Sequence, residues 1–290
     1  DGNNEIPTME HVNPFRDIPC HKDIYYFYYV ATKAGIIQQD DRSGILCAML
    51  LKWIRDGYVN FTMEPSTGWF KKDKYEIDFS GEIPTENILE EKMLGYFREA
   101  SGDNQILENK EFERWCKRNY EEIEDWFNDL IEFEEKELKE KGLMKKQTTY
   151  KKFLGIDIAN EKVVYEPSFR DDIIYTKGLK RFLLDFSSIE EKEVIEVKLW
   201  EEYLMFASIL GIADEVEKQI GKLCPEFNQY SNIDYTYTML ATRTFMYGGV
   251  RSAANAYSAA HSSSYSGGGG FSSFGGGGGG FSGGGGGGSR

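Results

Sequence analysis

Apolar residues recur at helical spacing through most of this chain, and most of these runs end at a glycine or a proline. The clearest run comprises Ile45, Leu46, Met49, Leu50 and Trp53. Steps of three and four place such side chains on one face of a helix. Gly57 then follows in a position typical of a helix end. The pattern predicts a fold of the α+β class that is mainly α, with a substantial buried core.

Two short stretches with alternating polarity, 58–63 and 74–80, follow that helix and predict a β-hairpin. Helix, helix and hairpin together indicate a winged-helix-like module. A longer helical stretch follows, with an expected bend near Asn119, and residues 143–176 read as short alternating β pieces. Helical spacing is expected to return from Gly178. The predicted organisation is an extended linker (1–20), a winged-helix-like module (21–82), a second helical or winged-helix-like module with a short β segment (83–177), and a helical module (178–228).

The C-terminal part has a different composition. Residues 229–256 fit either a weak helix or a docking segment. From Tyr257 to Arg290 the chain is almost entirely Ser, Gly, Phe, Ala and Tyr, with long glycine runs. Such a segment buries too little apolar area to offset the entropy of ordering, so 257–290 is predicted to be a disordered tail. Its phenylalanines suggest, from composition alone, weak self-association.

Acidic residues outnumber basic ones by 48 to 34, which gives a formal charge of −14. A chain of this charge repels nucleic acid and anionic lipid unless a local basic patch overrides the total. Between residues 43 and 79, where a winged helix would contact DNA, five basic residues are balanced by five acidic ones. Nucleic acid is therefore disfavoured as a partner, although a winged-helix regulator stays open as the alternative function.

No catalytic, cofactor-binding or metal-binding residue is predicted. The three histidines and four cysteines are dispersed and lack zinc-ligand spacing. We expect the cysteines to be reduced, buried thiols in a reducing compartment. Acidic pairs such as Glu134-Glu135 lie beside lysines or apolar stripes and predict solvated helix faces. Large aromatic residues are predicted to be structural or interaction anchors: Tyr25, Tyr28, Trp53, Trp115, Trp126, Trp200 and Tyr203.

The longest uncharged apolar stretch within a periodic segment, 203–213, is shorter than the roughly 20 residues that a membrane span requires. It is therefore expected to belong to the core. With no signal peptide visible at its start, the chain is predicted to be a soluble, cytoplasmic fragment.

Several stretches together resemble one family. They are FRDIPCHKDIYYFYYVA (15–31), GILCAMLLKWIRDGYV (44–59), ILENKEFERWCKRNY (106–120), the block from 178 to 220 that contains LWEEYLMFASILGIADEV, and the glycine-rich tail. They are similar to the C-terminal portion of predicted membrane proteins called domain of unknown function 2207. The resemblance implies a soluble region on the cytoplasmic face of a bacterial membrane, attached through a segment outside this chain. It implies no catalytic residues.

The expected function is a protein-interaction or scaffolding module with an unknown protein partner. An enzyme of unknown class is the second alternative.

Overall fold

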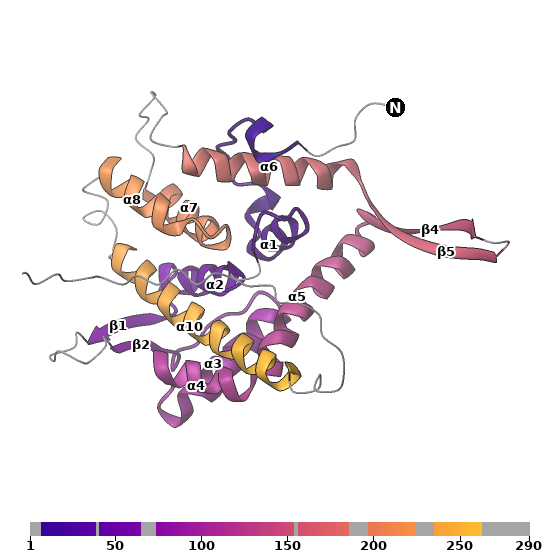
Figure 1. The fold of residues 1–290 in the computed structure, drawn as a ribbon. Helices are drawn as coiled ribbons and strands as arrows, with labels where there is room; N and C mark the ends of the chain where they lie inside the picture. Colours follow the sequence, from indigo (N-terminus) through magenta and orange to yellow (C-terminus); the bar gives the residue numbers. More distant parts are fainter. Residues whose placement is uncertain are drawn as a thin grey trace, which may run out of the picture.

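The computed structural model describes residues 7–38, 41–64, 74–153, 156–185, 197–223 and 235–262. These residues form a mainly helical α+β structure with two small antiparallel sheets, which confirms the predicted fold class (Figure 1). The predicted division into modules stays a prediction, because the buried apolar residues of all of them form one continuous cluster.

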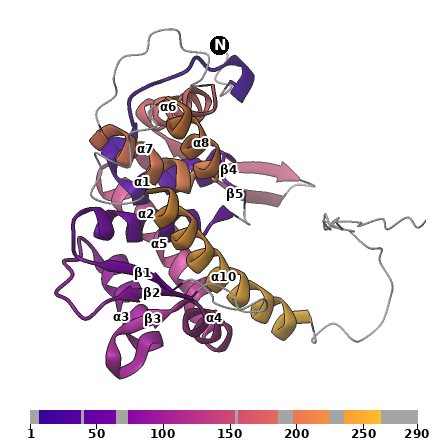
Figure 2. The same cartoon turned by 90° about the vertical axis from the view of Figure 1, so that its left-hand side faces the viewer.

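Helix α2 (Gly44–Arg55) lies at the centre of this cluster. It packs against α1 (Ile24–Lys33), α7 (Val197–Ile209) and α10 (Tyr235–Ser262). Every residue from Gly44 to Leu51 is buried, so the predicted recognition helix has no exposed face along this stretch (Figures 1 and 2).

The predicted hairpin is present as β1 (Asn60–Glu64) and β2 (Lys74–Asp78). A third strand, β3 (Ile106–Glu108), pairs antiparallel with β2, with Ile77 opposite Leu107. This strand lies between α3 (Ile88–Ser101) and α4 (Asn109–Arg118), within the predicted second module. The sheet therefore joins the two modules that the sequence separated at residue 82.

The bend at Asn119 is confirmed, since this residue interrupts the helical backbone between α4 and α5 (Tyr120–Glu140). Helix α5 ends at Gly142, whose φ of +71° is readily adopted by glycine. The chain then forms a long hairpin of β4 (Met144–Phe153) and β5 (Ile156–Tyr165).

Helix α6 spans Pro167–Leu184, so it starts well before Gly178 and the predicted boundary at 177/178 falls inside it. Proline fits the first helical turn because its missing N–H would be unpaired there. Gly178 is no helix end. A Cβ atom there would lie 2.8 Å from the carbonyl oxygen of Asn13, so this glycine permits a close approach to the N-terminal segment. That segment is more than a linker, because Val12 and Ile18 are buried and the Phe15 amide donates to the Gly178 carbonyl.

Residues left ambiguous by the sequence form α10, which packs along α4, α5 and α2. The helix continues to Ser262, beyond the predicted start of the tail at Tyr257. Gly249 lies at the contact with α4, where an added Cβ would be 2.3 Å from the ring of Phe112. The rest of the predicted tail, 263–290, lies outside the described residues.

The remaining elements are α8 (Ala213–Leu223) and two short 3-10 turns, Met9–His11 and Cys20–Lys22. Gly211 separates α7 from α8 with a φ of +71°, as a break between two helices requires.

Candidate functional site

A cavity of about 590 Å³ lies beside the start of α1. Its walls come from the turn before α1, the C-terminal half of α5, the start of α6 and the segment just before α3. Leu143 and Ser168, which flank the β4–β5 hairpin in sequence, also line it. The cavity therefore lies next to the root of the hairpin.

The turn that forms one wall has an unusual backbone. Cys20, His21 and Lys22 all have positive φ angles, at 57°, 55° and 60°. A left-handed conformation costs a residue other than glycine roughly 1–2 kcal/mol, and such strain gathers at functional sites. The turn brings Cys20 and His21 into the lining of the cavity.

Two of the carboxylates that line the cavity have clear local roles. Asp23 caps α1 by accepting hydrogen bonds from the amides of Tyr25 and Tyr26, at 2.9 and 3.1 Å. The Tyr26 hydroxyl donates to Asp172 at 2.7 Å, and burial together with this carboxylate raises the pKa of Tyr26.

Two more carboxylates are paired with lysines. Glu137 lies 3.0 Å from the ammonium of Lys141, and Glu86 lies 2.9 Å from that of Lys52. Of these two lysines, only Lys141 lines the cavity.

Glu134 is the fifth carboxylate and differs from the others. It lies on α5 with an exposed fraction of 5%. Within the described part of the chain, no hydrogen bond or ion pair to its side chain is found. Burial and the negative charge of Asp23 raise its pKa from 4.5 to about 7, against the opposing effect of Lys141. The prediction that Glu134 lies on a solvated helix face is therefore wrong.

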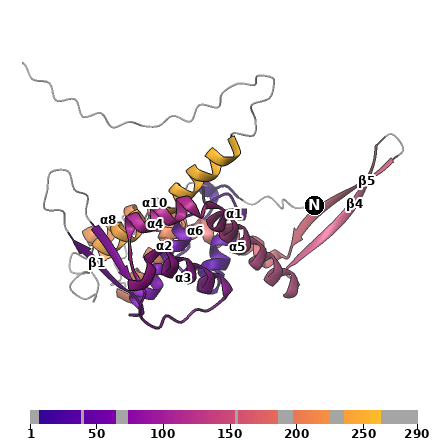
Figure 3. The ribbon, with the colours of Figure 1, turned by 90° about the horizontal axis from the view of Figure 1, so that it is seen from below.

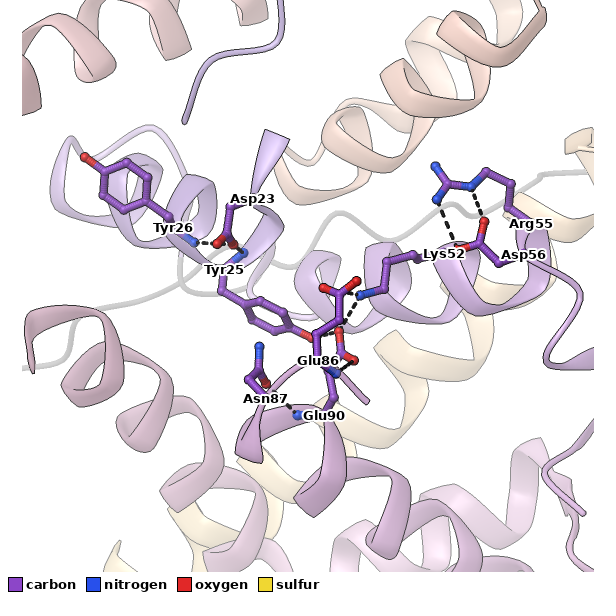
Figure 4. A network of polar contacts seen from close by, with 9 residues as sticks. All are labelled: Asp23, Tyr25, Tyr26, Lys52, Arg55, Asp56, Glu86, Asn87 and Glu90. Atoms are coloured by element: carbon purple, nitrogen blue, oxygen red, sulfur yellow. Dashed lines mark hydrogen bonds and ion pairs between the residues drawn. The ribbon is translucent and has the colours of Figure 1, made fainter. Parts of the chain in front are cut away.

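A separate polar network lies directly behind this wall (Figure 4). Glu90 is fully buried and accepts hydrogen bonds from the Tyr25 hydroxyl at 2.7 Å, the Lys52 ammonium at 2.5 Å and the Glu86 amide at 2.8 Å. A buried charge with this many partners is satisfied, so it joins α1, α2 and α3 structurally and offers little to a ligand.

All seven predicted aromatic anchors are buried in the described core. Tyr25 lines the cavity as well, next to Tyr26. The sequence analysis missed Glu134, although a signal exists: it replaces an apolar residue in the buried stripe Leu130, Glu134, Leu138 of α5. An acidic residue on an apolar stripe differs from one on the charged face.

The second prominent feature is the β4–β5 hairpin, which projects away from the helical body (Figures 1 and 3). From Met144 to Tyr165 the sequence contains five lysines against one aspartate and one glutamate, in a chain that is strongly acidic overall. Described side chains that are exposed on the hairpin include Lys145, Lys146, Tyr150, Lys152, Val163 and Val164.

Two further searches bear on function. Among the described residues, no group of three or more His, Cys, Asp or Glu side chains is arranged to hold a metal ion. None of the helices within the described ranges combines the length and apolar character that crossing a bilayer requires.

Residues 173–220 match the family model described as "Predicted membrane protein (DUF2207) C-terminal domain". The matched segment covers the second half of α6, α7 and most of α8. It confirms the family resemblance for this block, while the resemblance of the stretches before it stays a prediction. Neither the curated proteins nor the solved structures contain a match.

Proposed function

We propose that this chain is the cytoplasmic region of a bacterial membrane protein and serves as a protein-interaction module. The match of residues 173–220 to a predicted membrane protein family supports the link to a membrane. The projecting β4–β5 hairpin is the observation that supports an interaction role.

A two-stranded hairpin that stands away from a core gains little stability from its own packing. The hairpin also exposes apolar surface, with Tyr150 at 70% exposure and Val163 and Val164 close to 40%. Exposed strand edges and apolar side chains favour association with other chains. The lysines on the hairpin favour a partner with an acidic surface.

The structure disfavours the winged-helix regulator in its expected form, because α2 is buried and does not present side chains to a DNA groove. Any nucleic-acid contact would have to use the hairpin lysines instead. The enzyme alternative gains no support from Cys20, since burial raises the pKa of its thiol and keeps it protonated.

The test is site-specific photocrosslinking in cells that express the full-length membrane protein. A photoreactive residue replaces Tyr150 on the hairpin, and a second variant carries it at Tyr58, which is 44% exposed on the body. We expect a protein adduct at position 150 that weakens when Lys145 and Lys146 are changed to Glu. Adducts of equal strength at both positions, or an adduct to nucleic acid, would contradict the proposal.

A further inference from the structure

We propose that the cavity beside the start of α1 binds an oligoamine, a small flexible molecule with two or more protonated amino groups. This inference is independent of the proposed role of the hairpin. It rests on the charge, the size and the lining of the cavity.

The charge of the cavity is strongly negative. Five carboxylates line it, from the turn before α1, the segment before α3, α5 and α6, and Lys141 is the one Lys or Arg among the described lining residues. Most of these carboxylates have partners of their own. Glu134 is buried, lines the cavity and has no partner among the described residues, so it is available to a cationic ligand.

The arrangement suits an extended cation better than a metal ion. A metal ion requires several ligands converging on one point, and no such group is found among the described residues. The carboxylates instead come from four separate elements around a volume of about 590 Å³. Charges spread in this way match a ligand whose positive charges are separated by methylene groups.

Aromatic rings supply the apolar part of the lining. Tyr25, Tyr26 and Phe133 all border the cavity. Aromatic faces attract ammonium groups and also pack against the methylene segments that join them. This combination distinguishes the cavity from the charged helix surfaces elsewhere on the protein.

Binding should depend on pH through Glu134. An ammonium group at Glu134 favours the ionised carboxylate, so binding near pH 7 releases a proton from that carboxylic acid to the solvent. Asp23, Glu137 and Lys141 act on the same carboxylate and stay charged through this range, while the ligand stays protonated. The affinity should therefore rise between pH 6 and pH 8.

His21 also lines the cavity and titrates in the same range, so it needs a control. The variant His21→Asn retains a residue that tolerates positive φ and removes the titrating ring. The pH dependence should persist in this variant and disappear in Glu134→Gln.

The experiment is isothermal titration calorimetry of the whole chain with spermidine, putrescine and, separately, Mg²⁺ at matched ionic strength. We expect saturable one-to-one binding of spermidine that weakens about tenfold or more in Glu134→Gln. The matched control is Glu132→Gln, on the exposed side of the same helix, which should bind as the wild type does.

Three results would overturn the proposal. They are the absence of saturable amine binding at millimolar concentration, equal weakening in Glu134→Gln and Glu132→Gln, and tighter binding of Mg²⁺ than of spermidine. Equal weakening would assign the effect to the overall negative charge of the chain. None of these outcomes bears on the crosslinking test of the hairpin.

Discussion

The substitution Gly249→Ala tests whether α10 is an integral part of the core. A Cβ atom at this position would lie 2.3 and 2.4 Å from two ring carbons of Phe112 and 3.1 Å from the sulfur of Cys116. The Phe112 ring is fully buried between Phe97 and Phe245, at centroid distances of 5.2 and 5.5 Å, and has little room to move. Overpacking of a core costs about 1–3 kcal/mol, and contacts this short favour the upper half of that range.

Alanine also improves the helix, which offsets up to about 1 kcal/mol of this cost. The net loss should be about 1–2 kcal/mol, and the melting temperature should fall by roughly 3–6 °C in a protein of this size. The measurement is thermal unfolding followed by circular dichroism.

Gly95→Ala is the matched control, because Gly95 lies in α3 with no atom within 4 Å of the added Cβ. This variant should gain about 0.5–1 kcal/mol. A Gly249→Ala protein that melts at or above the wild-type temperature would refute the docking of α10 on α4.

Three further perturbations have defined outcomes. Gly44→Ala should destabilise the protein more than Gly249→Ala in the same melting assay, because its Cβ would lie 2.1 Å from the backbone carbonyl oxygen of Ser208 and a whole helix would have to move. Trp200→Ala, at a side chain only 4% exposed, should lose about 3–5 kcal/mol in urea denaturation, and near-wild-type unfolding would contradict its place in the core. The raised pKa of Glu134 means that folding favours its protonated form, so wild-type stability should fall as pH rises from about 4.5 to about 7 and level off above that. Glu134→Gln should remove this dependence and exceed wild-type stability at pH 8 by up to about 3 kcal/mol, with no difference at pH 4; equal urea midpoints at both pH values would count against a buried acid.

Local patterns in the sequence predicted several elements correctly. The apolar stripe from Ile45 to Trp53 became α2, and the stops at Gly142 and Gly211 fell at real helix ends. These features depend on residues close in sequence, so periodicity and glycine chemistry were sufficient to find them.

The elements that the sequence placed wrongly depend on distant contacts. Gly178 was taken as the start of a helical region, yet its role is a close approach to Asn13 across the core. The segment that forms α10 has weak periodicity, and its helix is supported by packing on α4. Tertiary contacts of this kind override local propensity and leave little trace in a single sequence.

The candidate site was harder to predict than the fold. Its aromatic wall was partly anticipated through Tyr25, but only as a core anchor. Glu134 was grouped with Glu135 as a solvated pair, because neighbouring glutamates look alike until the phase of the helix is considered. The left-handed turn at Cys20–Lys22 carries no glycine, so no residue type announced it.

The base of the β4–β5 hairpin is joined to the body at few points, including the hydroxyl contact between Tyr29 and Tyr165 and the bond from the Glu166 amide to the Leu143 carbonyl. Leu143 also borders the cavity. Ten residues of strand extend about 33 Å from this pivot, so the hairpin is a lever with its fulcrum at the cavity wall. A rotation of about 5° between α5 and α6 would displace the far end by about 3 Å. Small adjustments in the angle of these two helices are therefore amplified into movements large enough to break or make contacts at the tip.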